Sequence, residues 1–219
     1  MRGRFITFEG GEGTGKSTQA LLLADRLEAA GIGVVLTREP GGSPGAEAIR
    51  HVVLSGAAQP LGAHAEAILF AAARDDHVRQ VIRPALDAGH WVICDRFADS
   101  TRIYQGSLGN VDSRLINALE RISVGNVRPD MTIILDVPAE IGLARAAKRS
   151  GAKADRFESE ALDFHKKLRD AYRDLAEREP ERCVVIDASQ DTAAVAEEVS
   201  AAVVERLGPS RAPLAAAAR

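Results

Sequence analysis

Short apolar runs alternate with longer amphipathic stretches along most of this chain. The runs are nearly continuous in Val, Ile, Leu and Phe, a pattern typical of parallel strands that are buried on both faces. They predict strands at residues 4–8, 34–37, 91–94, 131–135 and 183–187. Apolar residues at helical spacing predict helices at residues 17–30, 45–54, 64–88, 112–125, 139–148, 158–179 and 191–207. The alternation predicts an α/β fold, a five-stranded parallel sheet with helices on both faces.

Three segments lack this periodicity. A polar loop is expected from the end of the third strand to about residue 110, and residues 148–156 are basic without an apolar stripe. Residues 209–219 are rich in alanine and are expected to fray. The long helix at 64–88 is expected to bend at Pro84, because proline lacks the backbone N–H that a helix needs. We therefore predict a single domain over residues 1–208.

Composition narrows the class of protein. With 46% hydrophobic and only 4% aromatic residues, the core must be built from Leu, Ile, Val and Ala. A formal charge of −3 and the absence of a long basic block disfavour a nucleic-acid partner. No apolar run approaches the ~20 residues that span a bilayer, and no signal-peptide core is present, so we expect a cytoplasmic protein without membrane contact. Cys94 and Cys183 are expected to be buried free thiols in a reducing compartment.

The turn after the first strand matches a phosphate-binding loop. Gly10, Gly15, Lys16 and Ser17 fit the pattern G-x-x-x-x-G-K-[ST] without substitution. Glycines let backbone N–H groups approach phosphate oxygens, and the next helix presents its positive N-terminal end to the same anion. Lys16 is expected to reach the β- and γ-phosphates, and Ser17 to ligate Mg²⁺. The predicted nucleotide-binding residues are Gly10, Gly11, Glu12, Gly13, Thr14, Gly15, Lys16, Ser17 and Thr18.

Charged residues stand where the predicted strands end, namely Glu9, Arg38, Glu39, Asp95, Arg96 and Asp136. Binding sites of open α/β sheets lie at the carboxyl ends of the strands. The chain has no Asn-Lys-x-Asp motif to read guanine, which disfavours a GTPase. A helicase would need more chain and a basic surface. A small kinase fits better, because it needs a second pocket for the acceptor and a means of excluding water.

Further motifs resemble those of bacterial thymidylate kinases. They are Phe8-Glu9-Gly10-x-Glu12-Gly13-x-Gly15-Lys16-Ser17-Thr18, Thr37-Arg38-Glu39-Pro40-Gly41-Gly42, Asp95-Arg96-Phe97-x-x-Ser100-Thr101 with Tyr104-Gln105-Gly106, and Arg128-Pro129-Asp130 before Leu135-Asp136-Val137. The matches run in order from residue 5 to about residue 187. The resemblance implies a P-loop kinase fold, transfer of the γ-phosphoryl group of ATP to dTMP with Mg²⁺ to give dTDP, and a homodimer.

The resemblance assigns acceptor binding to residues from several segments. Phe70 and Arg74 are four apart on a helix and share a face; they would stack on thymine and hydrogen-bond its edge. Tyr104 would crowd the ribose 2′ position and favour deoxynucleotides. Arg38 and Arg96 would hold the monophosphate, since a planar guanidinium suits a phosphate dianion. The remaining substrate contacts are assigned to Glu9, Pro40, Ser100, Thr101 and Gln105, and the Glu39-Pro40 bond is often cis in the family.

The resemblance also implies which groups are catalytic. Asp95 follows an apolar strand and is expected to share the Mg²⁺ shell with Ser17, while Glu9 would help to order the waters of the metal. Glu12 would interact with the sugar of the acceptor and position the transferred group. Because charge develops on the phosphoryl oxygens, cations are expected to carry most of the catalysis, and Lys16 and Arg96 are assigned to it.

The family supplies a further catalytic arginine either from the loop, directly after the acid, or from a mobile lid. Gly13 follows Glu12 in this chain, so the resemblance places the arginine in a lid at about 148–158 that closes over ATP. Arg149 and Arg156 are favoured as catalytic groups because an arginine can bridge two oxygens. Lys153 is assigned to ATP binding.

Other interpretations remain open at this point. Another deoxynucleotide kinase or a deoxynucleoside kinase would share the loop and sometimes the basic lid. A nucleotide-dependent switch would bind a triphosphate without an acceptor. Singly, Phe70 could be a core residue, Arg38 and Arg96 could pair with Glu39 and Asp95, and the basic lid could be a solvated loop.

Overall fold

Five parallel strands form the centre of the molecule. The computed structural model describes residues 2–150, 157 and 160–208. Its strands are β1 (Phe5–Glu9), β2 (Val34–Arg38), β3 (Trp91–Asp95), β4 (Met131–Asp136) and β5 (Cys183–Asp187). They pair in the order β2-β3-β1-β4-β5, and every pairing is parallel. The predicted five-stranded parallel sheet is therefore confirmed.

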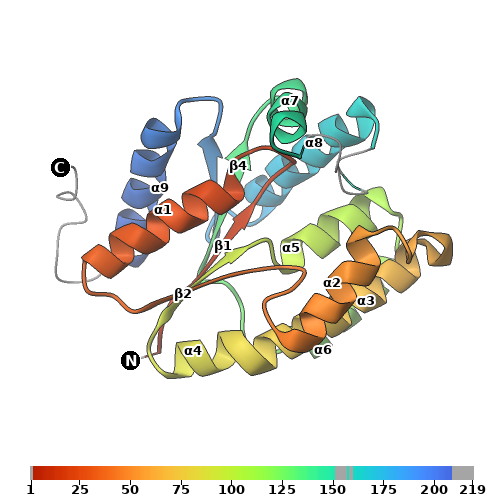
Figure 1. The fold of residues 1–219 in the computed structure, drawn as a ribbon, viewed down its shortest axis with the longest axis horizontal. Helices are drawn as coiled ribbons and strands as arrows, with labels where there is room; N and C mark the ends of the chain where they lie inside the picture. Colours follow the sequence, from red (N-terminus) through yellow and green to blue (C-terminus); the bar gives the residue numbers. More distant parts are fainter. Residues whose placement is uncertain (1, 151–156, 158–159, 209–219) are drawn as a thin grey trace.

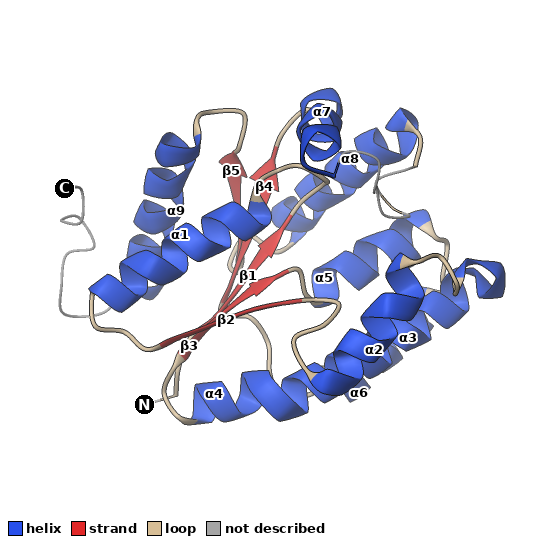
Figure 2. Ribbon diagram, in the orientation of Figure 1, coloured by secondary structure: helices blue, strands red, loops and turns tan. Residues whose placement is uncertain are grey.

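Helices cover both faces of this sheet (Figure 1, Figure 2). Helices α1 (Lys16–Ala29) and α9 (Thr192–Leu207) lie on one face. The other face is covered by α4 (Arg83–Asp87), α5 (Ala98–Thr101) and α8 (Leu162–Arg178). The remaining α-helices of the described residues are α2 (Pro44–Leu54), α3 (Gly62–His77), α6 (Ser113–Ser123) and α7 (Ala139–Ser150).

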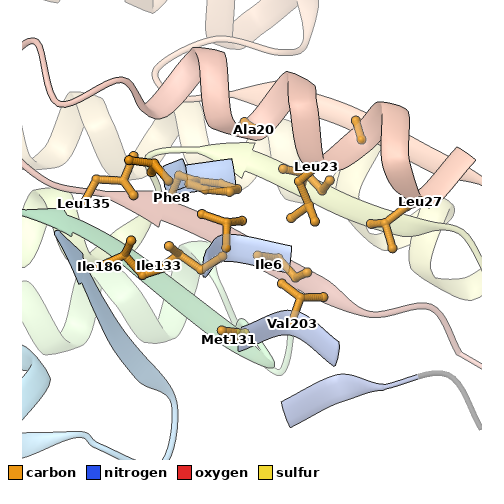
Figure 3. Packing of buried hydrophobic residues seen from close by; sticks show 14 of the residues in the cluster. Ile6, Phe8, Ala20, Leu23, Leu27, Met131, Ile133, Leu135, Ile186 and Val203 are labelled. Carbon is orange, nitrogen blue, oxygen red and sulfur yellow. The ribbon is translucent and has the colours of Figure 1, made fainter. Parts of the chain in front are cut away.

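Successive side chains of β1 point to opposite faces of the sheet, so they pack alternately against the two helix layers. Ile6 and Phe8 point toward α1 and α9, where they join a core with Leu23 and Leu27 (Figure 3). Phe5 belongs to the core on the opposite face. By the same alternation, the side chain of Glu9 points toward α5 and α8. Its ionisable carboxylate can therefore contact residues of these two helices.

Two predicted elements differ from the observed ones. The helix expected at 64–88 contains a π-helical segment, η2 (Val78–Ile82), just before Pro84, which interrupts the α-helical hydrogen-bond pattern. The bend expected at Pro84 stays a prediction. The polar loop expected up to residue 110 is wrong. The segment is helical, first as α5 and then as the π-helix η3 (Arg102–Leu108). Its polar residues line the cavity described below, so apolar periodicity does not reveal the helix.

The cysteine prediction is confirmed, because Cys94 and Cys183 are both buried free thiols. Within the described part of the chain, no helix combines the length and the apolar character needed to cross a membrane. Short connections include a 3₁₀ turn, η1 (Gln59–Leu61), between α2 and α3. The Glu39-Pro40 bond, at the turn after β2, is cis, as expected.

Candidate active site

A cavity of about 400 Å³ opens at the carboxyl ends of β1, β2 and β3. The phosphate-binding loop and the start of α1 form one end of it, and residues of α3 and η3 form the other. Sixteen of the predicted site residues line it: Glu12, Gly13, Gly15, Lys16, Ser17, Thr18, Arg38, Pro40, Phe70, Arg74, Asp95, Arg96, Ser100, Thr101, Tyr104 and Gln105. Residues from five separate segments thus meet at one edge of the sheet.

The phosphate-binding loop is packed tightly against its neighbours. A Cβ atom on Gly10, whose φ is +132°, would lie 2.5 Å from the carbonyl oxygen of Leu135. A Cβ atom on Gly13, with φ of +67°, would lie 1.9 Å from the carbonyl oxygen of Gly142 on α7. Only glycine fits at both positions, for backbone conformation and for space. The loop is therefore held between β4 and α7.

Lys16 lies over this loop and is only 7% exposed. Its Nζ donates to the carbonyl oxygens of Gly11 at 2.7 Å and Gly10 at 3.2 Å. Burial, followed by the charge of Arg96, lowers the pKa of Lys16 to about 8. A bound polyphosphate would supply the negative charge that this ammonium group lacks in the free protein.

Ser17 and Asp95 form the second polar pair at this end of the cavity. The Ser17 hydroxyl, in the first turn of α1, donates a short hydrogen bond to Oδ2 of Asp95 at the end of β3. Asp95 reaches α1 because β3 alternates, with Trp91 and Ile93 on the α1 face. The pair presents hard oxygen atoms beside the loop, which is the donor type that Mg²⁺ prefers.

Arg96, Glu12 and Tyr104 form a partly buried cluster in the middle of the cavity. Nη2 of Arg96 donates to Oε1 of Glu12 at 2.5 Å, and the Tyr104 hydroxyl donates to the same oxygen at 3.0 Å. The guanidinium carbon lies 5.3 Å from the centre of the Tyr104 ring. Burial disfavours the charge of Arg96, but Glu12, Tyr104, Tyr172 and Glu9 together outweigh it, so the pKa of Arg96 is raised. This cation therefore stays charged in the site.

The far end of the cavity contains a buried ion pair between Arg74 on α3 and Glu39 after β2. Nε of Arg74 lies 2.8 Å from Oε2 of Glu39, and the two residues are 3% and 6% exposed. Nη2 of Arg74 also donates to the carbonyl oxygen of Phe97 and to Oγ1 of Thr101, both at 3.1 Å. His77 completes the cluster, with Nδ1 3.0 Å from Glu39. The pairing fixes the direction of Arg74 without a ligand.

Several predicted residues lie elsewhere. Gly10, Gly11 and Thr14 line a smaller cavity behind the phosphate-binding loop. Glu9 is fully buried beneath the main cavity and does not line it. Arg149 is in the last turn of α7, while Lys153 and Arg156 fall outside the described residues. Asp136, a strand-end acid like Glu9, accepts two hydrogen bonds from Arg169 at 2.6 and 2.8 Å.

Sequence reasoning missed some residues of the site. Arg50 on α2 lines the cavity, and its Nη1 donates to the carbonyl oxygen of Pro40 at 2.5 Å. Tyr172 on α8 donates its hydroxyl to Glu9 at 2.8 Å. In sequence, the first is one arginine in an amphipathic helix and the second an aromatic in a charged helix. No local pattern distinguishes either from a surface or core residue. Other cavity residues not predicted as ligands are Glu39, Leu54, Phe97 and Phe157.

Comparisons with known proteins agree with one another. The thymidylate kinase family model matches residues 8–199. A thymidylate kinase of Nitrobacter winogradskyi is 65% identical over 207 residues, which are 94% of this chain and 90% of the relative. One of Bradyrhizobium diazoefficiens is 63% identical over 210 residues, 95% of this chain and 92% of the relative. The crystal structure of thymidylate kinase from Ehrlichia chaffeensis has a TM-score of 0.75 at 36% identity, and the match covers 93% of this chain and 100% of that one.

Proposed function

Because the chain belongs to the thymidylate kinase family, whose members phosphorylate dTMP to dTDP, we propose that its cavity binds ATP and dTMP end to end with Mg²⁺ between them. The chain is a kinase that acts on these small molecules. The single observation that carries the proposal is the layout of the cavity. A phosphate-binding loop lies at one end, an aromatic and an arginine from α3 lie at the other, and Arg96 lies between them.

ATP is assigned to the end formed by the phosphate-binding loop and α1. Backbone N–H groups of the loop and Lys16 would bind the β- and γ-phosphates, as the motif requires. Ser17 and Asp95 fit Mg²⁺, because their oxygen atoms are adjacent and beside the loop. Phosphate and water oxygens would complete the shell, as Mg²⁺ commonly keeps several waters. Bound Mg²⁺ would neutralise charge on the transferred group.

The thymine ring is assigned to the end lined by α3 and η3. Phe70 would offer its ring for stacking, and Arg74 would hydrogen-bond the edge of the base, since Glu39 already fixes its direction. Thr101 and Gln105 are both buried at this wall and would supply further polar contacts. Tyr104 is held by Glu12 and would exclude a ribose 2′-hydroxyl.

The phosphate of dTMP is assigned to the middle of the cavity, where the guanidinium groups of Arg96 and Arg38 would bind it. Arg38 is half exposed and pairs with Glu47 at 2.9 Å, a surface contact that a phosphate dianion can replace. Arg96 keeps its charge beside Glu12, so it would hold the acceptor while Glu12 orients the sugar. Charge stabilisation by Lys16, Arg96 and lid arginines would then carry the transfer.

An acceptor panel with ATP and Mg²⁺ tests this function. We expect efficient turnover with dTMP and no measurable phosphorylation of thymidine, CMP or AMP in a coupled assay for ADP. Discrimination against dUMP, which lacks one methyl group, should be only about 10–200-fold. Preferential phosphorylation of thymidine would reject dTMP as the acceptor. ATP consumption that no acceptor stimulates would indicate a switch instead of a kinase.

We propose that the protein acts as a homodimer that associates through α2 and α3. Ile68 on α3 is 51% exposed, and Leu61 and Val52 beside this helix pair are also exposed. We expect Ile68→Lys to shift the protein toward monomer in sedimentation velocity. Leu21→Lys is the matched control, because Leu21 is equally exposed at 51% but lies on α1 across the sheet. Identical sedimentation of both variants and wild type would contradict this interface.

We also place the activity in the cytoplasm. The two free thiols, Cys94 and Cys183, support a reducing compartment.

A further inference from the structure

We infer that Glu9 is a positioning residue for Arg96, acting through the hydroxyl groups of Ser100 and Tyr172. Glu9 does not line the cavity itself. It orients two hydroxyl hydrogens so that both hydroxyl oxygens face the Arg96 guanidinium with their lone pairs. The inference rests on the function proposed above, in which Arg96 binds the phosphate of dTMP.

Glu9 is buried and its carboxylate is fully used by the protein. Oε1 accepts from the backbone N–H groups of Phe97 at 2.8 Å and Ser100 at 3.2 Å. Oε2 accepts from the hydroxyl of Ser100 at 2.7 Å and from that of Tyr172 at 2.8 Å. With 0% exposure, no room is left for a substrate or for the water shell of a metal. Its role must therefore be exerted through these four donors.

The backbone donors bring Glu9 to the first turn of α5. Phe97 is the N-cap of this helix and has no side chain that can cap it. The Glu9 carboxylate, at the end of β1, caps the helix instead by accepting from the N–H groups of Phe97 and Ser100. The positive N-terminal end of the helix in turn stabilises the negative carboxylate. Arg96 directly precedes this turn and has a φ of +69°, a conformation that L-residues rarely adopt. Glu9 thus stabilises the junction that carries Arg96.

The hydroxyl groups of Ser100 and Tyr172 donate to Glu9 and accept from Arg96, which sets the direction of the hydrogen bonds between them. Burial, followed by the charge of Asp99, raises the pKa of Glu9, but four donors converge on its two oxygens, as they do on an ionised carboxylate. An ionised carboxylate can only accept hydrogen bonds, so the single hydrogens of Ser100 and Tyr172 both point to Glu9. Burial raises the pKa of Tyr172, which keeps that hydrogen in place. Nη1 of Arg96 lies 3.3 Å from the Ser100 hydroxyl oxygen and 3.4 Å from that of Tyr172. It also donates to the carbonyl oxygen of Gly10 at 3.2 Å, so this nitrogen faces three acceptors.

Glutamine at position 9 would test the direction without changing the packing. Its carbonyl oxygen can still accept from Phe97 and Ser100, which keeps α5 in place. Its NH₂ group would donate to the two hydroxyl oxygens, so neither hydroxyl hydrogen could point to residue 9 any longer. One hydroxyl could donate to the other, because their oxygens lie 3.1 Å apart, but the remaining hydrogen would compete with Nη1 of Arg96 for the same side of its oxygen. Glu9→Gln keeps the shape of the side chain but replaces an acceptor by a donor. It should therefore disturb the hydrogen bonds of Arg96 and leave the packing around position 9 unchanged.

The experiment measures the Kd ratio, which is the Kd of thymidine divided by the Kd of dTMP, by calorimetry. We expect Glu9→Gln to weaken dTMP binding by about tenfold, the scale of a lost hydrogen bond to a charged group, and to leave thymidine binding unchanged. A merely structural role would weaken both, because the base pocket shares α5. Asp136→Asn is the matched control, since this strand-end carboxylate pairs with Arg169 and does not contact Arg96; its Kd ratio should equal that of wild type.

Two further variants keep the test decisive. Arg96→Ala measures the contribution of the phosphate contact itself. If its Kd ratio is unchanged, the proposed role of Arg96 fails, and this inference fails with it. If Arg96→Ala lowers the ratio and Glu9→Gln stays within twofold of wild type, only the role of Glu9 is overturned. Should Glu9→Gln not fold, Tyr172→Phe removes one acceptor of Nη1 and should lower the same ratio severalfold; no change there would overturn the inference.

Discussion

Replacing Lys16 with alanine is expected to abolish turnover, with kcat reduced at least ~10³-fold even at saturating ATP. Lys16 lies over the phosphate-binding loop with its ammonium group on the carbonyl oxygens of Gly10 and Gly11. Without Lys16, the loop lacks the positive charge that would stabilise the β- and γ-phosphate oxygens in the transition state. A coupled assay for ADP with dTMP as acceptor measures the loss. Full activity in Lys16→Ala would mean that the loop is not the phosphate site.

Lys166→Ala provides the matched control, since this lysine is on the surface of α8 and its ion-pair partner among the described residues is Glu140. The pH profile is a second readout of the same prediction. The pKa of Lys16 is lowered to about 8, so the free enzyme loses this charge as the pH rises through 8. Bound triphosphate favours the charged form, so the KM for ATP should rise above pH 8. Lys16→Arg stays charged throughout and should lack that rise.

The sheet could be predicted because its strands are buried on both faces, which gives short continuous apolar runs that resemble nothing else in the chain. The segment after Arg96 could not. Its residues Ser100, Thr101 and Gln105 belong to helical segments and line the cavity with polar side chains. A helix without an apolar stripe has the sequence pattern of a loop. Likewise, the π-helical segment at 78–82 depends on how α3 and α4 pack, which periodicity does not record.

The parts of the candidate site whose residues are close together in the sequence could be predicted from short motifs. The phosphate-binding loop and the strand-end residues Asp95 and Arg96 meet in the cavity as their sequence positions indicated. Contacts made across the fold were not accessible in this way. Tyr172 reaches Glu9 over 163 positions, and Arg74 reaches Glu39 over 35. The direction of Glu9, away from the cavity, follows from which face of β1 it occupies.

The structure also explains why the phosphate-binding loop does not supply a further catalytic cation. Any side chain at Gly13 would strike the backbone of α7, with the carbonyl oxygen of Gly142 1.9 Å from its Cβ position. Of the cations that line the described cavity, Lys16 belongs to the phosphate-binding loop, Arg74 is paired with Glu39 and Arg96 with Glu12. We therefore propose that a further cation for the transferred phosphoryl group comes from the predicted lid, which begins in the last turn of α7.

Arg149→Ala or Arg156→Ala is accordingly expected to lower kcat by ~10³-fold or more, whichever residue reaches the phosphoryl oxygens. KM for dTMP should change little, because the contact strengthens only as charge develops in the transition state. Lys153→Ala should have a smaller effect, since a lysine cannot bridge two oxygens. Single-turnover rates separate this loss from slow product release, and Arg178→Ala on the surface of α8 is the arginine control. Rates near wild type for both arginine variants would reject the lid as the source, and Arg96 would then have to stabilise the transition state without a second guanidinium.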